Sequence, residues 1–180
     1  MTVTVDLARG DTGTDGDDVI LGTDGDDVIN GFGGNDIICA GAGDDVISAG
    51  DGADIVFAGS GADIIVAGQG RDTVYGQGGD DFVSGGKGKD VIVGGGGDDE
   101  LRGNNGTDFI SGGTGNDVIN GGQKADVLQG GGGQDSLSGG TRPDTLDGGD
   151  GLDEYVGGGG NDTCVVDPGG LLETATSCER

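Results

Sequence analysis

The chain has 180 residues, of which 48 are glycine and 3% are aromatic, and its formal net charge is −26. So few large apolar side chains together with so much charge are typical of a disordered chain, so folding in water needs a further source of free energy. The same composition excludes nucleic-acid binding, because 8 scattered basic residues form no positive patch, and no apolar run approaches the ~20 residues of a membrane-spanning helix.

Residues 1–15 are expected to form an N-terminal cap. Residues 2–7, TVTVDL, alternate between polar and apolar side chains, which is the pattern of a half-buried strand. We expect this strand to cover one end of the core that the following repeats build.

From Gly16 the chain repeats every nine residues without an insertion or deletion, as in GDDVILGTD (16–24) and GDDVINGFG (25–33). The fifth position is apolar in all 17 blocks. The third position is aspartate in every block: Asp18, Asp27, Asp36, Asp45, Asp54, Asp63, Asp72, Asp81, Asp90, Asp99, Asp108, Asp117, Asp126, Asp135, Asp144, Asp153 and Asp162. A phase held this strictly indicates a structural repeat and not a low-complexity linker.

Each block reads as a three-residue strand, such as VIN or VIS, and a six-residue turn rich in glycine. Alternation along the strand points the fifth residue inward and its two neighbours outward, and glycine permits the backbone conformations that a tight turn needs. One strand and one turn only reverse the chain, so two blocks make one circuit. We therefore predict an all-β fold over residues 16–163, a parallel β-roll (a right-handed β-solenoid of 18-residue circuits) with two parallel sheets.

Stacked circuits would align every second aspartate in a column, one column on each edge of the roll, beginning with Asp18 and Asp27. Like charges stacked so closely repel one another, and more strongly when partly buried. Calcium fits this arrangement because it takes six to eight oxygen ligands, here carboxylates from two stacked turns and glycine carbonyls, whereas magnesium demands a tighter octahedron and zinc prefers nitrogen and sulfur. Binding of the metal would supply the missing folding free energy.

The block GGTGNDVIN at 112–120 resembles the GGxGxDxUx nonapeptide of RTX (repeats-in-toxin), or hemolysin-type, calcium-binding proteins, and AGAGDDVIS at 40–48 is a variant of it. This resemblance covers residues 13–168. It implies a parallel β-roll with calcium between stacked turns, the third-position aspartates as metal ligands, bacterial secretion, and folding triggered by extracellular calcium.

The two columns leave eight gaps on one edge and seven on the other, so we expect about 12 to 15 calcium ions. Lys124 and Arg142 stand where 15 other blocks begin with glycine. Their charged groups either replace a calcium ion or point to solvent.

Residues 164–180 leave the repeat. Cys178 follows Cys164 after 14 residues, a suitable span for a disulfide worth about 3 kcal/mol in the loop-entropy account. The segment resembles the closing segment of actinobacterial secreted calcium-binding repeat proteins. We predict a Cys164–Cys178 disulfide, with two free thiols as the alternative. A disulfide agrees with an oxidising, extracellular location.

The chain has no histidine, no isolated acid pair and no serine with a plausible base, so we expect no enzyme. We predict a secreted calcium-binding module with a structural role. The alternative is an adhesion or ligand-binding module that uses an apolar outer sheet face. The sixth-position residues of that face are Leu21, Cys39, Phe57, Tyr75 and Val93. Contiguous exposed apolar surface more often marks a contact site, here for a second copy or a partner domain, although the preference of such residues for strands is the competing explanation.

Overall fold

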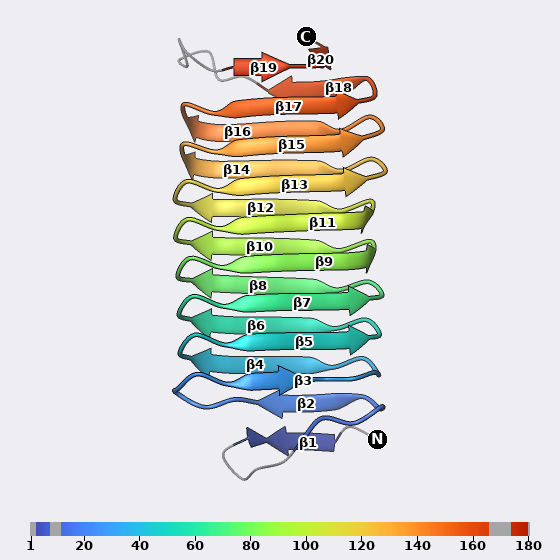
Figure 1. Ribbon diagram of the computed structural model, residues 1–180, viewed down its shortest axis with the longest axis vertical. Coiled ribbons are helices and arrows are strands. Elements are labelled where there is room, and N and C mark those ends of the chain that lie inside the picture. The colour runs from blue at the N-terminus through green and yellow to red at the C-terminus, as the bar shows by residue number, and fades with distance from the viewer. Residues whose placement is uncertain (1–2, 8–11, 166–173, 180) are drawn as a thin grey trace.

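Two parallel sheets face each other along the whole length of the molecule (Figure 1). The computed structural model describes residues 3–7, 12–165 and 174–179. In these residues the 11-stranded sheet contains, in spatial order, β1 (Val3–Asp6), β2 (Asp18–Leu21), β4 (Ile37–Ala42), β6 (Ile55–Ser60), β8 (Thr73–Gly78), β10 (Val91–Gly96), β12 (Phe109–Thr114), β14 (Val127–Gly133), β16 (Thr145–Gly151), β18 (Asp162–Val165) and β20 (Cys178–Glu179). The 9-stranded sheet contains β3 (Val28–Asn30), β5 (Val46–Asp51), β7 (Ile64–Gln69), β9 (Phe82–Gly88), β11 (Glu100–Gly106), β13 (Val118–Gln123), β15 (Ser136–Thr141), β17 (Glu154–Gly159) and β19 (Thr174–Thr176).

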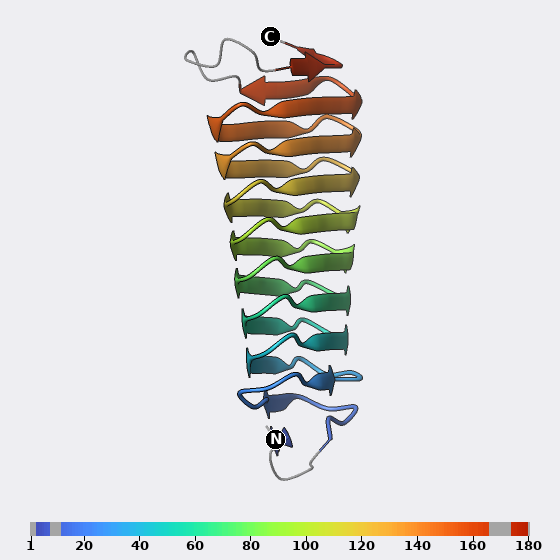
Figure 2. The same ribbon diagram turned by 60° about the vertical axis from the view of Figure 1, so that its left-hand side comes forward.

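Neighbouring strands of one sheet pair in parallel, 18 residues apart along the repeat. Val19 pairs with Ile37, and Ile38 pairs with Val56. Figure 2 shows the resulting stack of circuits, with the two ends of the chain at opposite ends of the stack. The predicted all-β parallel solenoid with two parallel sheets and 18-residue circuits is confirmed.

The core is a single file of fifth-position side chains between the sheets. From Ile20 to Tyr155 these side chains are at most 2% exposed. Four alanine methyl groups from the starts of turns are buried with them: Ala40, Ala49, Ala58 and Ala67. Full burial of an aliphatic side chain contributes about 1.5–3 kcal/mol, but this core receives one such side chain per nine residues. The thin core agrees with the expectation that apolar burial alone does not hold the fold.

The strands are longer than predicted. We expected three residues per strand, but most strands run for six or seven, as in β4 and β9. Gly41 adopts a φ of 123°, which lets the chain bend without leaving the sheet, and it still pairs with Gly59 in the next circuit. The first half of each predicted turn therefore belongs to the sheet, and the whole circuit is more regular than the sequence pattern suggests.

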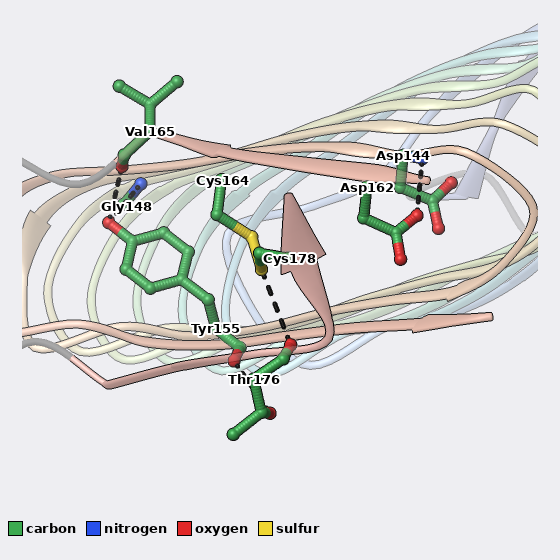
Figure 3. Close-up of a disulfide and its surroundings, with 8 residues drawn as sticks. All are labelled: Asp144, Gly148, Tyr155, Asp162, Cys164, Val165, Thr176 and Cys178. Atoms are coloured by element: carbon green, nitrogen blue, oxygen red, sulfur yellow. Dashed lines mark hydrogen bonds between the residues drawn. A yellow bond between two sulfur atoms is a disulfide. The ribbon is translucent and has the colours of Figure 1, made fainter. Parts of the chain in front are cut away.

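Both ends of the core are covered. At the N-terminal end, β1 pairs with β2 and buries Val5 opposite Ile20, so the expected first strand is present. At the C-terminal end, Cys164 and Cys178 form the predicted disulfide, with their Cα atoms 5.7 Å apart (Figure 3). The buried Tyr155 hydroxyl accepts a hydrogen bond from the Gly148 N–H (3.1 Å) and donates one to the Val165 carbonyl (3.0 Å). These bonds satisfy the only phenol among the fifth-position side chains.

Candidate metal centre

Each turn runs from the seventh position of one block to the third position of the next, and ends in an aspartate directly before a strand. The turns of Asp18, Asp36 and every second aspartate thereafter form one edge, here called the first edge, and the turns of Asp27, Asp45 and so on form the second edge. One side-chain oxygen of each column aspartate from Asp36 onward accepts a hydrogen bond from the backbone N–H of the aspartate one circuit earlier. This bond spans all 15 gaps, at 2.8–3.0 Å. Figure 3 shows the last such pair, Asp144 and Asp162. The two predicted columns are therefore present.

The second carboxylate oxygen is buried and has no hydrogen-bond partner. This holds for the Oδ2 atom of every third-position aspartate from Asp36 to Asp162, and for Oδ1 of Asp18. A buried acceptor without a donor costs about 1–3 kcal/mol, and more if it is charged. A row of such atoms in one fold points to a partner that is a cation and not a protein donor.

A glycine leaves room for this unpartnered oxygen. A Cβ atom added to Gly94 would lie 2.1 Å from Asp99 Oδ2 and 2.8 Å from the carbonyl oxygen of Gly112, in the next circuit. Gly76 has the same relation to Asp81 and Gly94, at 2.3 and 2.7 Å. Oxygens from two stacked circuits thus converge beside a glycine, and a side chain there would displace one of them.

Side chains alone do not complete a metal site. Across the described parts of the chain, no group of three or more acidic or cysteine side chains comes together. Each gap offers two aspartates, and the remaining oxygens must come from the backbone. Oxygen is the ligand that hard cations such as calcium prefer, and the chain has no histidine for a softer metal.

The family model for the RTX calcium-binding nonapeptide repeat matches residues 12–47, 40–65, 57–92, 75–110, 84–119, 111–141 and 129–164. The chain belongs to this RTX repeat family. No curated protein matches it significantly. The RTX assignment and the roll together show a calcium-binding structural repeat domain. The described part of this RTX domain holds no helix long and apolar enough to cross a membrane.

Burial makes the RTX aspartates hard to ionise in the absence of metal. The pKa values of Asp72, Asp99 and Asp126 are raised to about 7, and burial of the carboxyl group is the largest cause. The neighbouring carboxylates of the column raise these values further, whereas the hydrogen bond from the previous circuit lowers them. A cation between the turns would remove this penalty, because it favours the charged form.

Two threonines, which the sequence pattern did not reveal, bind the first aspartate of each column. The N–H and Oγ1 of Thr14 donate to Asp18 Oδ2 at 2.7 and 2.8 Å, and Thr23 donates in the same way to Asp27 at 2.6 and 3.0 Å. The only signal was a threonine four residues before each of these aspartates. Protein donors thus bind one oxygen of each of these aspartates, and at Asp18 the other oxygen, Oδ1, stays buried without a partner.

A second ladder runs along the outside of the turns, one position before the buried aspartates. The Asp98 N–H donates to Asp80 Oδ1 (2.8 Å), and the Asn116 N–H donates to Asp98 Oδ1 (2.6 Å). These outer side chains therefore bind the following circuit, whereas the buried aspartates bind the preceding one. Asp and Asn recur at the second position of the repeat, but the sequence pattern alone does not indicate this ladder.

Lys124 and Arg142 adopt positive φ angles of 77° and 86°, where other turns use glycine. Both side chains are exposed, and neither forms an ion pair with a described residue. Lys124 nevertheless lowers the pKa of Asp108 and Asp126, although burial dominates both values. Its charge therefore acts on the gap between these aspartates.

The predicted apolar face lies on the 11-stranded sheet. Leu21, Cys39, Phe57, Tyr75 and Val93 stack one above another in successive strands. The rings of Phe57 and Tyr75 are stacked with centroids 5.1 Å apart, and Phe57 is 37% exposed. Cys39 is half-buried and free.

Proposed function

We propose that this chain is a bacterial, secreted module that folds when calcium binds between its stacked turns, and that its role is structural and not catalytic. The observation that carries the proposal is the row of buried, unpartnered carboxylate oxygens along both edges. In the metal-free chain each of them opposes folding, so a ligand that satisfies them couples its binding to the folded state.

The ligands proposed for calcium are the 17 third-position aspartates, together with glycine carbonyls of the adjacent circuit such as that of Gly112. Bound calcium would supply positive charge to each pair of carboxylates. The 15 gaps set the upper limit, and we expect about 12 to 15 ions because Lys124 and Arg142 occupy turns of the first edge. Anomalous density for well-occupied ions between all the turns that carry Asp126, Asp144 and Asp162 would rule out replacement of calcium by these cations.

An extracellular location is supported by the chemistry of the chain. The Cys164–Cys178 disulfide agrees with an oxidising compartment. Extracellular calcium modules work with dissociation constants of about 10⁻⁴–10⁻³ M, which suits calcium outside the cell. Folding would then be triggered after export, where calcium is abundant.

Far-UV circular dichroism tests the folding step. We expect an unfolded spectrum in EDTA, a β-rich spectrum in about 10 mM calcium, and little change in the same concentration of magnesium, which demands a tighter, octahedral ligand set. Identical spectra in EDTA and calcium would contradict calcium-driven folding. An equal response to magnesium would contradict the proposed coordination.

The second candidate is an adhesion or docking role for the apolar face that carries the stacked Phe57 and Tyr75 rings. It would hold a second copy or a partner domain. The variant Phe57→Ser/Tyr75→Ser should still fold with calcium, because both side chains lie outside the core. If the face joins two copies, light scattering should show a dimer for the unmodified chain and a monomer for the variant.

A further inference from the structure

The basic side chains of the roll are concentrated on one edge. Of the six lysines and arginines in the described residues, only Arg102 lies outside the turns of the first edge. The other five are all exposed and are here called the basic stripe: Arg71, Lys87, Lys89, Lys124 and Arg142. The turns of the second edge contain no lysine or arginine. They carry exposed aspartates in addition to the buried column, and five of these are here called the acidic stripe: Asp24, Asp26, Asp44, Asp80 and Asp98.

The two stripes have complementary patterns when they are compared turn by turn. The basic stripe covers five successive turns of the first edge, from 67–72 to 139–144, and only the central turn, 103–108, carries no basic residue. The acidic stripe covers five successive turns of the second edge, from 22–27 to 94–99, and only its central turn, 58–63, carries no exposed acid. Successive turns of both edges are spaced by the same inter-strand distance, about 4.8 Å. When the two sets of five turns are aligned end to end, each of the four charged turns of one stripe therefore faces a charged turn of the other. This holds whether the two rolls are parallel or antiparallel.

Four of the five acidic side chains, all except Asp24, accept hydrogen bonds in the outer ladder. The Asp44 N–H donates to Asp26 Oδ1 (2.9 Å), the Ala62 N–H donates to Asp44 Oδ1 (2.8 Å), and the Asp98 N–H donates to Asp80 Oδ1 (2.8 Å). Fixed charges lose less side-chain entropy on association than free ones. These four side chains are thus ordered before any partner arrives.

Calcium would change the sign of the first edge. Each turn of the basic stripe also contains a buried column aspartate, from Asp72 to Asp144, which offsets the positive charge when it is ionised and metal-free. The whole chain then carries −26, so copies repel one another. Each ion would bring two positive charges to a gap that holds about one column aspartate on average, so the ions would more than offset the columns. The first edge would then become positive, while the second edge would still present the acidic stripe as exposed carboxylates at its surface. This step rests on the proposed function.

We propose that the basic stripe of one calcium-loaded copy binds the acidic stripe of a second copy. The two surfaces are different, so the contact is heterologous and leaves an unused stripe on each partner. Such contacts continue into open-ended assemblies unless the geometry closes a ring. We assign a second copy as the partner because the second edge of this same chain carries the opposite charges at the same turn-to-turn spacing.

Sedimentation velocity in calcium at low salt tests this assembly. The unmodified chain should form species larger than a monomer, and these should dissociate in about 1 M NaCl, where the Debye length is about 3 Å. The variant Lys87→Glu/Lys89→Glu should weaken the association constant by at least about tenfold, because it places like charges opposite each other. The variant Phe57→Ser/Tyr75→Ser should associate like the unmodified chain, since the apolar sheet face is not part of this contact.

A charge swap gives the sharper test. In the parallel arrangement the turn of Lys87 and Lys89 faces Asp44, and in the antiparallel arrangement it faces Asp80. In the Lys87→Glu/Lys89→Glu background, adding Asp44→Lys should restore association if the two rolls are parallel, and adding Asp80→Lys should restore it if they are antiparallel. The change that rescues therefore identifies the direction. Circular dichroism of each sample separates the two proposals, because failure to fold in calcium contradicts the proposed function. A folded monomer, association that survives Lys87→Glu/Lys89→Glu, or failure of both swaps in folded protein would overturn the assembly proposal.

Discussion

At the scale of single residues, the decisive feature is an aspartate with two unequal oxygens. One oxygen of Asp99 accepts the Asp81 N–H at 2.8 Å, while the other is buried without a partner. The hydrogen bond sets the position of the carboxylate in the folded chain. The free oxygen makes that position unfavourable until a cation arrives. Each column aspartate thus links two circuits through one oxygen and offers the other oxygen as a proposed metal ligand.

The variant Asp99→Asn tests the ligand role. Asp99 borders two gaps, those with Asp81 and Asp117, so we expect the calcium stoichiometry from isothermal titration calorimetry to fall by up to two ions. The matched control is Asp98→Asn, which alters the exposed neighbour and keeps the oxygen that accepts the Asn116 N–H. Equal stoichiometry for both variants would show that the column does not bind the metal.

The variant Gly94→Ala tests the space beside the ligand. The added methyl group would meet Asp99 Oδ2 and the Gly112 carbonyl oxygen at 2.1 and 2.8 Å. We expect a loss of about 1–3 kcal/mol in the calcium-loaded state, as for other overpacked sites, measured by urea unfolding in excess calcium. Gly132→Ala is the control, because a Cβ atom there has no neighbour within 4 Å. If both substitutions lower the free energy of unfolding equally, Gly94 is required for reasons other than the metal.

At the scale of the elements, much of the roll could be predicted because the nine-residue phase never slips. The phase alone predicted the file of buried side chains from Ile20 onward, both aspartate columns and the 18-residue circuit. The strand lengths could not be predicted, since pairing through Gly41 depends on the path of the backbone around the bend. For the same reason the sequence did not show which oxygen of Asp99 is bonded, nor that Thr14 would bind Asp18.

The C-terminal disulfide is expected to stabilise the end of the roll. The disulfide joins β18 to β20 and covers the last circuit of the core. We expect Cys164→Ser/Cys178→Ser to lower stability by about 3 kcal/mol, the loop-entropy value for this span, and to raise the calcium concentration at the folding midpoint. Cys39→Ser, which alters the free thiol on the outer face, should shift the midpoint little. Equal midpoints for the two variants would mean that the closing segment does not hold the end of the roll.

At the scale of the whole molecule, the fold depends on the ionisation of many buried carboxyl groups. Burial raises the pKa of Asp36, Asp81 and Asp108 to about 6, and that of Asp72 and Asp99 to about 7, from the usual aspartate value of 3.8. A raised carboxyl pKa means that the folded state binds more protons than the unfolded state. Stability therefore falls as the pH rises through this window, and the penalty is absent below the unfolded value.

We accordingly expect the metal-free chain to gain β structure on acidification. In EDTA, circular dichroism at about pH 4.5 should show more β signal than at about pH 7.5, because the carboxyl groups are protonated in the folded form. A sample at the higher pH with about 1 M salt is the control, because salt screens the repulsion between charges without protonating the carboxyl groups. Recovery of the same signal by salt alone would assign the effect to net charge. No gain at low pH would contradict the raised pKa values.

Small-angle X-ray scattering during a calcium titration, with the bound ions counted, tests whether calcium binding between the turns folds the chain. We expect a radius of gyration of about 45 Å in EDTA, as for an unfolded chain of this length, and less than about 20 Å in calcium. Compaction should accompany the uptake of about 12 to 15 ions. A compact chain in EDTA, or full compaction with only one or two ions bound, would contradict calcium-driven folding.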